Sequence, residues 1–154
     1  MKNTSLCYIE KDGKYLMLHR TKKQNDENGG KWIGVGGKFN AGESPEDCIR
    51  REILEETGLF AKKLDYRAVI TFVSDECGTE YMHLFTCDSF CGELTENCDE
   101  GELKWVDKKD VLKLCLWEGD KIFLKELTRS DKSFFSLKLI YSKDTLINSE
   151  INRY

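Results

Sequence analysis

Three glutamates, Glu52, Glu55 and Glu56, are the residues of this sequence whose type and spacing most clearly allow chemistry. In a helix of about 3.6 residues per turn they lie on one face, within roughly 100° of one another. Like charges at this spacing repel one another, and the repulsion grows as they leave water. Arg51, four residues from both Asp47 and Glu55, can offset part of it and hold Glu55 in one rotamer.

An all-oxygen set of carboxylates suits Mg²⁺, or Mn²⁺, far better than Zn²⁺. Such a cation usually binds a few carboxylates and completes its shell with water and substrate phosphate. It would neutralise both the glutamates and a polyphosphate, position a water and stabilise the leaving group. The paired glycines Gly36 and Gly37 would bring backbone groups close to the same phosphates. The cluster therefore predicts a magnesium-dependent site for a polyphosphate substrate.

A helix over residues 45–57 must present these carboxylates. Ser44 is a favourable N-cap, Pro45 occupies the first helical position, and Asp47 completes an acidic capping box. Gly58 supplies the stop, because glycine readily adopts the left-handed conformation after a last turn. A salt-bridged surface helix is the alternative explanation of the charges, but it requires no fixed glycines.

The remaining chain alternates between strand-like and helix-like segments. A hairpin is expected over 4–10 and 14–20, followed by a polar loop over 21–31 and the glycine-rich WIGVGGKF. Further strands are predicted at 63–73, 80–91, 102–107 and 134–141, with helices at 108–113 and 119–130. This order predicts one layered α/β or α+β domain over 1–154, with 143–154 as a C-terminal tail of undefined structure.

Composition and charge restrict the class of protein. The net charge is −4, with 24 basic and 28 acidic residues mixed along the chain, which argues against a stable nucleic-acid partner. Because no stretch approaches the ~20 apolar residues of a membrane span, and the first residues lack a signal-peptide pattern, we expect no membrane association and a cytoplasmic location.

The seven cysteines are expected to be reduced thiols rather than disulfide partners. Cys87, Cys91 and Cys98, with Cys77 and His83 nearby, suggest zinc as an alternative, and with it an interaction protein. Zinc sites normally contain paired C-x2-4-C knuckles, whereas this stretch has a single C-x3-C within a strand-like pattern. Buried or half-buried thiols are therefore the favoured interpretation.

The spacing Gly37-x5-Glu43-x7-Arg51-Glu52-Ile53-x-Glu55-Glu56-x-Gly58-Leu59 matches the Nudix box without a departure. Seven specified identities at a frequency of about 0.07 each coincide by chance with a probability on the order of 10⁻⁸ per starting position. The chain thus resembles a Nudix hydrolase. The resemblance implies an α/β/α sandwich around a mixed sheet, and attack of water on a nucleoside diphosphate linked to another group.

The resemblance also implies roles for particular residues. The metal ligands would be Glu52, Glu55, Glu56 and the backbone carbonyl of Gly36, with the metal carrying most of the catalysis. Glu43 and Arg51, with the structural glycines Gly37 and Gly58, would hold the geometry of the loop and helix. A loop carboxylate near the metals, acting as ligand or general base, would be Glu100 or Glu102.

The flanking residues resemble the MutT-like branch that hydrolyses oxidised purine nucleoside triphosphates. That branch stacks a Trp on the base and hydrogen-bonds its edge with an acidic residue, which makes Trp117 and Asp120 the candidates, with Glu118 as a further one. Phosphate-contacting candidates are Gly37, Lys38, Lys23 and Arg20, although a solvated charge is the alternative for each cation. Vertebrate members read the base with an Asn in the W-x-G segment where this chain has Ile33.

The resemblance therefore implies a Mg²⁺-dependent diphosphatase that converts 8-oxo-dGTP to 8-oxo-dGMP and pyrophosphate and keeps damaged nucleotides out of DNA. Other Nudix substrates are the nearest alternative: a dinucleoside polyphosphate, ADP-ribose or an RNA 5′ end. A non-catalytic nucleotide-binding module is an alternative of another class, and degenerate box carboxylates would be expected of it. The enzyme would be a monomer or a homodimer.

Overall fold

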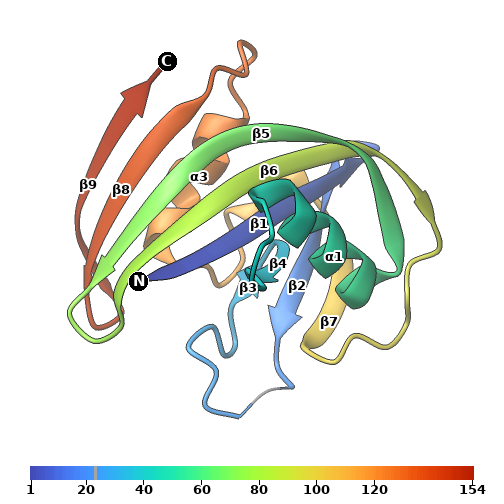
Figure 1. Ribbon diagram of the computed structural model, residues 1–154, viewed down its shortest axis with the longest axis horizontal. Helices are drawn as coiled ribbons and strands as arrows, with labels where there is room; N and C mark the ends of the chain where they lie inside the picture. Colours follow the sequence, from blue (N-terminus) through green and yellow to red (C-terminus); the bar gives the residue numbers. More distant parts are fainter. Residues whose placement is uncertain (23) are drawn as a thin grey trace.

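A nine-stranded mixed sheet forms the body of the protein in the computed structural model, which describes residues 1–22 and 24–154 (Figure 1). The main strand order is β3-β2-β1-β6-β5-β8-β9, with β4 paired to β1 and β7 paired to β2. The strands are Lys2–Lys11 (β1), Lys14–Arg20 (β2), Trp32–Ile33 (β3), Val35–Lys38 (β4), Leu59–Ser74 (β5), Gly78–Gly92 (β6), Gly101–Asp107 (β7), Phe135–Ser142 (β8) and Thr145–Arg153 (β9). Parallel pairing of β1 with β6 and of β5 with β8 makes the sheet mixed.

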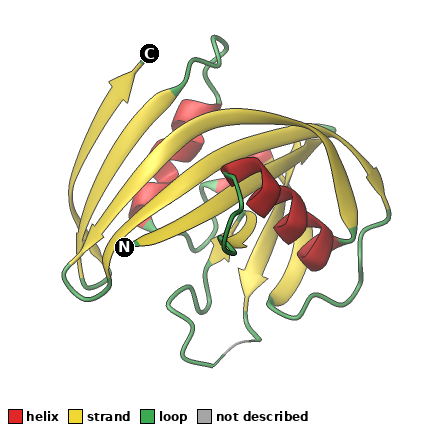
Figure 2. Ribbon diagram, viewed as in Figure 1, coloured by secondary structure: helices red, strands yellow, loops and turns green. Residues whose placement is uncertain are grey.

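Helices cover both faces of this sheet (Figure 2). They are Pro45–Thr57 (α1), Lys108–Val111 (α2) and Glu118–Leu127 (α3). Ile49 and Ile53 of α1 are fully buried in one apolar cluster with Phe85, whereas Phe123 of α3 is buried in a second cluster with Leu84 of the same strand, β6. Because adjacent residues of a strand point to opposite faces, Leu84 and Phe85 separate the two layers. The predicted α/β/α sandwich is confirmed.

Helix α1 begins and ends at the predicted residues. The Ser44 side chain accepts a hydrogen bond from the Asp47 backbone N–H at 3.0 Å, and Asp47 accepts one from the Ser44 N–H at 3.1 Å, so the capping box is complete. At the other end Gly58 adopts a left-handed conformation with φ 78° and donates its N–H to the Leu54 carbonyl. These local signals fix which residues of α1 face the sheet.

The predicted hairpin and strands are present, with β5 and β6 extending beyond the predicted 63–73 and 80–91. The helices are shorter than predicted, since α2 ends at Val111 and α3 at Leu127. The predicted tail of undefined structure, 143–154, is instead mostly strand β9, antiparallel to β8. Asp75 stabilises the turn before β9 by accepting hydrogen bonds from the Ser142 hydroxyl and the Lys143 N–H.

All seven cysteines are free thiols. Cys87 and Cys98 are buried, while Cys77 and Cys91 are exposed. The cysteines of the C-x3-C pair therefore differ in environment, since Cys87 lies in the apolar cluster beneath α1. None of the helices in the described part of the chain is long and apolar enough to cross a membrane.

Candidate active site at helix α1

Strand β4 and helix α1 meet where the glycine pair faces the glutamates. A Cβ added at Gly37 would lie 2.5 Å from the carboxyl carbon of Glu52, and one added at Gly36 would lie 2.0 Å from the Ser5 carbonyl oxygen. Only glycine allows both approaches, the first to a side chain and the second to the neighbouring strand β1. Sequence and packing thus bring the Glu52 carboxylate against the backbone of β4.

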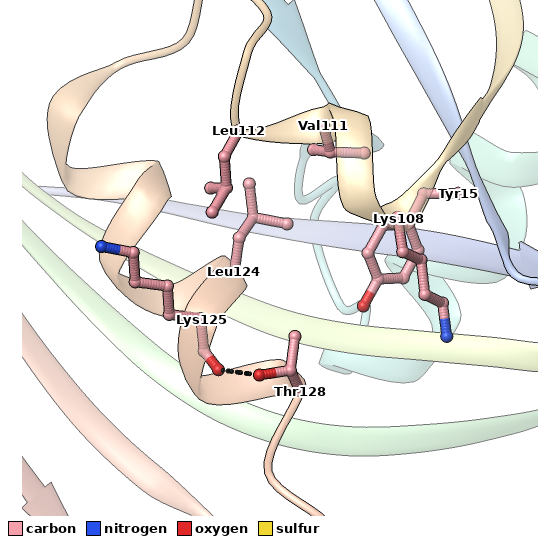
Figure 3. A pocket seen from close by; sticks show the side chains of 7 residues that line it. All are labelled: Tyr15, Lys108, Val111, Leu112, Leu124, Lys125 and Thr128. Atoms are coloured by element: carbon pink, nitrogen blue, oxygen red, sulfur yellow. Dashed lines mark hydrogen bonds between the residues drawn. The ribbon is translucent and has the colours of Figure 1, made fainter.

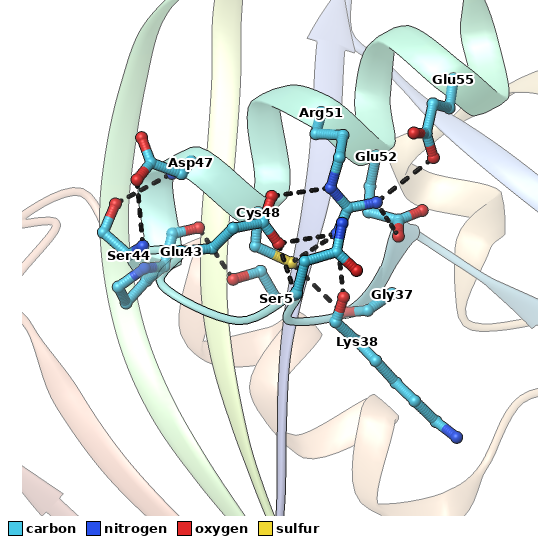
Figure 4. Close-up of polar contacts among 12 residues, drawn as sticks. Ser5, Gly37, Lys38, Glu43, Ser44, Asp47, Cys48, Arg51, Glu52 and Glu55 are labelled. Atoms are coloured by element: carbon cyan, nitrogen blue, oxygen red, sulfur yellow. Dashed lines mark hydrogen bonds and ion pairs between the residues drawn. The ribbon is translucent and has the colours of Figure 1, made fainter.

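Arg51 donates hydrogen bonds to several groups around this junction (Figure 4). Its guanidinium donates to both carboxylate oxygens of Glu43 at 2.7 and 2.9 Å, to Glu52 at 2.8 Å and to the backbone carbonyl of Lys38 at 2.9 Å. A weaker contact of 3.3 Å reaches Glu55, whose side chain is 59% exposed. Hydrogen bonds from Arg51, together with one from the Asn40 N–H, lower the pKa of Glu43 to about 2. The arginine therefore joins the loop, β4 and α1 into one unit.

Glu56 has the most unusual environment of the three glutamates. The residue is only 7% exposed, and its Oε2 atom is buried without a hydrogen-bond partner in the described structure. Burial, followed by the charges of Glu52 and Glu100, raises the pKa of Glu56 to about 8, although Arg20 and a backbone hydrogen bond from Gly36 oppose this shift. At neutral pH this carboxyl group therefore holds a proton unless a cation compensates it.

The carboxylate oxygens of this cluster are of the kind that bind a hard divalent cation. An orphaned buried carboxylate oxygen, with further carboxylates around it, is the environment that Mg²⁺ or Mn²⁺ would compensate. Within residues 1–22 and 24–154, no three His, Cys, Asp or Glu side chains converge as a ready ligand set. Glu52 contacts the Arg51 guanidinium through its Oε1 atom at 2.8 Å, and Glu55 does so through its Oε2 atom at 3.3 Å.

The structure separates the two candidates for the loop carboxylate. Glu100 forms an ion pair with Arg20 at 3.0 Å and contributes to the raised pKa of Glu56, so it belongs to the same electrostatic cluster. Glu102 lies opposite His19 in the pairing of β7 with β2 and is exposed. Arg20 also donates to Asp26 at 2.8 Å, which engages its guanidinium in two ion pairs. Of the two alternatives, Glu100 is the one beside Glu56.

Trp117 and Asp120 lie together at the start of α3. The Trp117 indole N–H donates to Asn28 at 2.8 Å, and the Lys31 ammonium lies 4.4 Å from the centre of the ring. Asp120 is 4% exposed, and burial, reinforced by the charge of Glu80, raises the pKa of its carboxyl group to about 8. An aromatic plane thus adjoins a buried acid that is largely protonated at neutral pH.

The other predicted substrate residues lie in less specific environments. Glu118 is 62% exposed and pairs with Lys121, its neighbour on α3. The Lys38 ammonium extends away from the carboxylates in Figure 4. Ile33 is buried with Leu18 and Cys98 in a small apolar cluster, so it serves the core. Lys23 lies outside the described residues.

Sequence reasoning missed the contribution of the loop between β2 and β3. Asn28 and Lys31 contact Trp117, and Asp26 binds Arg20. It also missed Glu80, which accepts a hydrogen bond from Thr4 at 2.7 Å and influences Asp120. Their only sequence signal is a polar composition, which is typical of any loop, because the contacts join segments far apart in the chain.

Two pockets adjoin other parts of the molecule. One of about 140 Å³ lies between β2, α2 and α3 (Figure 3), where the ammonium groups of Lys108 and Lys125 point away from it. None of the predicted site residues lines it. A second, of about 550 Å³, is lined partly by Lys22, Cys98 and Glu102 and flanks the loop that carries Glu100.

Replacing Gly37 with Ala is expected to reduce kcat by about 10- to 100-fold while changing the free energy of unfolding by less than about 1 kcal/mol. The new methyl group would displace the Glu52 carboxylate, which is the end of a flexible side chain and can move cheaply. Measuring kcat and urea denaturation on the same preparation tests whether activity falls while stability is kept. Unchanged kcat would show that the position of Glu52 against β4 is unimportant.

Replacing Asp120 with Asn is expected to stabilise the chain increasingly as pH rises from about 4 to about 8. The pKa of Asp120 is about 8 in the folded chain against 3.8 for the ordinary group, so across this window the folded state holds a proton that the unfolded state has lost. Stability contributed by the protonated acid is therefore lost with rising pH, and Asn removes that loss. Urea denaturation at several pH values, with exposed Asp88→Asn as the control, measures the difference. A pH-independent difference would contradict the raised pKa.

Comparison with known proteins relates this geometry to a family. A model described as the NUDIX domain matches residues 2–127. An oxidized purine nucleoside triphosphate hydrolase of Danio rerio is 28% identical, with 96% of this chain and 92% of the relative covered. An ADP-ribose pyrophosphatase of Methanocaldococcus jannaschii is 34% identical over 74% of this chain and 66% of its own length. The crystal structure of the MutT protein of Bacillus halodurans superposes with a TM-score of 0.87 at 25% identity, covering 99% of this chain and 98% of that one.

Proposed function

Since the chain belongs to the NUDIX domain family of hydrolases, we propose that it hydrolyses purine nucleoside triphosphates with Mg²⁺, chiefly 8-oxo-dGTP to 8-oxo-dGMP and pyrophosphate. The observation that favours this substrate is that Trp117 and the buried acid Asp120 lie together at the start of α3. A planar indole can stack on a purine, and a neutral carboxyl group can both donate and accept at the edge of the base. The similarity to the oxidized purine nucleoside triphosphate hydrolase of Danio rerio supports the same choice.

Each part of the site has a separate role in this proposal. Glu52, Glu55, Glu56 and the Gly36 carbonyl would hold the cation, which when bound supplies charge compensation for the polyphosphate and an activated water. Arg51 fixes Glu43 and the loop before α1, so the carboxylates keep their place relative to β4. Glu100, paired with Arg20, would bind the ion or accept a proton from the attacking water. One water is consumed, and the bond between the α- and β-phosphates is cleaved.

A substrate comparison tests the proposal. With Mg²⁺ present, kcat/KM should be at least about tenfold higher for 8-oxo-dGTP than for dGTP, because a matched polar edge supplies more than about 1.4 kcal/mol. The products should be the monophosphate and pyrophosphate. Equal kcat/KM for 8-oxo-dGTP and dGTP would exclude the sanitising role. Faster cleavage of ADP-ribose would identify ADP-ribose as the preferred substrate instead. Absence of hydrolysis with every nucleotide would favour a non-catalytic binding module.

A further inference from the structure

The loop between β2 and β3 is fastened by its own backbone. The Arg20 N–H donates to the Lys31 carbonyl at 3.0 Å, and the Gly30 N–H donates to the Arg20 carbonyl at 2.8 Å. Within the loop, the Lys31 N–H donates to the Asn28 carbonyl at 3.0 Å. These bonds hold the backbone of Asn28, Gly30 and Lys31 against the end of β2.

One side chain of this loop reaches the carboxylate cluster. Asp26 accepts a hydrogen bond from Arg20 Nε at 2.8 Å, and the same guanidinium binds Glu100 at 3.0 Å. The side chains of Asp26, Arg20 and Glu100 are only 7, 12 and 19% exposed. Ion pairs shielded from water to this degree, one of them also a charge-assisted hydrogen bond, define geometry more strictly than surface ion pairs. Asp26 and Glu100 are thus held on one guanidinium.

The same aspartate also reaches toward the aromatic residue of α3. Its second oxygen, Oδ1, accepts the backbone N–H of Asn28 at 3.1 Å. The side-chain oxygen of Asn28 in turn accepts the indole N–H of Trp117 at 2.8 Å. Both carboxylate oxygens of Asp26 therefore accept hydrogen bonds, and Asn28 takes part through its backbone N–H and its side-chain oxygen. A continuous series of contacts runs from Glu100 to Trp117: an ion pair joins Glu100 to Arg20, and hydrogen bonds then lead from Arg20 through Asp26 and Asn28 to the indole.

We propose that Asp26 and Asn28 are positioning residues that hold the Trp117 ring in register with Glu100, so that binding of the base is coupled to the arrangement of the carboxylates. This role rests on the proposed function, in which Trp117 stacks on the base. A base that shifts the indole moves the Asn28 side chain with it, and Asn28 shares Asp26 with Arg20. The coupling is a free-energy linkage between two parts of one site, so breaking the bridge removes the part of turnover that depends on the stacked purine base.

Kinetics of Asn28→Leu provide the first test. Leu keeps the size of the side chain but removes the acceptor, so kcat/KM for a purine triphosphate should fall about fivefold, the usual worth of one such hydrogen bond. The value for dCTP should hardly change. Asn28→Asp, which retains an acceptor, should restore purine turnover to within about twofold. In a Trp117→Phe background, which lacks the indole donor, Asn28→Leu should have no further effect. Equal losses with purine and pyrimidine, or additive losses in the double variant, would overturn the proposal.

A spectroscopic test requires no substrate. In the nucleotide-free protein, Glu100→Gln should shift the ¹H–¹⁵N indole resonance of Trp117, while the indole of Trp105 serves as the internal control. The shift should disappear in the Asn28→Leu background, in which preserved dispersion of the amide resonances shows that the chain is folded. An unmoved Trp117 resonance, or the same shift with and without the bridge, would overturn the coupling. Because this outcome is independent of turnover, a failure of the bridge can be distinguished from a failure of the proposed substrate.

Discussion

Replacing Glu56 with Gln should lower kcat at least about a thousandfold while leaving the chain folded, with a Tm that is unchanged or higher. Gln has nearly the same shape as the protonated carboxyl group but cannot compensate a cation. Burial near Glu52 and Glu100 makes the ionised form of Glu56 costly, which is why its pKa is raised to about 8. Removing the ionisable group removes that cost, so the gain in stability should be larger at pH 8 than at pH 5.

Three measurements check this result together: steady-state kinetics, thermal unfolding, and thermal unfolding with added Mg²⁺. The cation should raise the Tm of the wild-type chain, because it binds the folded state, and should do so much less in the variant. Glu150→Gln, on the exposed strand β9, is the matched control and should behave as wild type in all three. Full magnesium-dependent activity in Glu56→Gln would exclude this carboxylate from the reaction.

Replacing Arg51 with Met should reduce both turnover and stability, with kcat lower by about 100-fold or more and Tm lower by about 5 °C. Met keeps an unbranched side chain but donates no hydrogen bond. Glu43 and Glu52, whose side chains are 15 and 14% exposed, would then lie close together without the guanidinium between them. The Lys38 carbonyl would lose its donor as well, so the loop before α1 would no longer be fixed to the helix.

The neighbouring Arg50 offers a matched control, because it occupies the same helix but is exposed. Arg50→Met should leave kcat and Tm close to the wild-type values. Arg51→Lys should recover only part of the activity, since a single ammonium cannot reproduce the two parallel bonds to Glu43. If Arg51→Lys matched the wild type in both kcat and Tm, the two parallel hydrogen bonds from Arg51 to Glu43 would not be what positions the glutamates.

The features that the sequence predicts best are those encoded locally. Helix α1 has the predicted bounds because its caps and its glycine stop act within a few residues of their own position. The segment that forms strand β9, TLINSEINR, lacks strong apolar alternation and so does not itself predict a strand; its pairing depends on β8 and on the turn stabilised by Asp75. Strand pairing between distant segments is information that a local pattern does not contain.

The same distinction applies to the candidate site. Helical periodicity alone predicts the contact of Arg51 with Glu55, which the structure shows, but it does not predict the shorter contact of Arg51 with its neighbour Glu52. The bond between Trp117 and Asn28 joins residues 89 positions apart, so no spacing rule could predict it. Burial of Ile33 in an apolar cluster was equally hidden, because the resemblance to other enzymes assigned that position to the base.

Strand β5 has a consequence for how the protein behaves at high concentration. Its second half, Ala68–Ser74, lies between β6 and β8, whereas among the described residues the stretch from Leu59 to Tyr66 pairs with β6 alone. An exposed strand edge of this kind could recruit another chain and begin aggregation. Register shifts interrupt the ladder on either side of Lys63, and the exposed Lys62 and Lys63 add charge at the same place. The irregular edge beside α1, with its two exposed lysines, is therefore expected to protect the protein from edge-to-edge association.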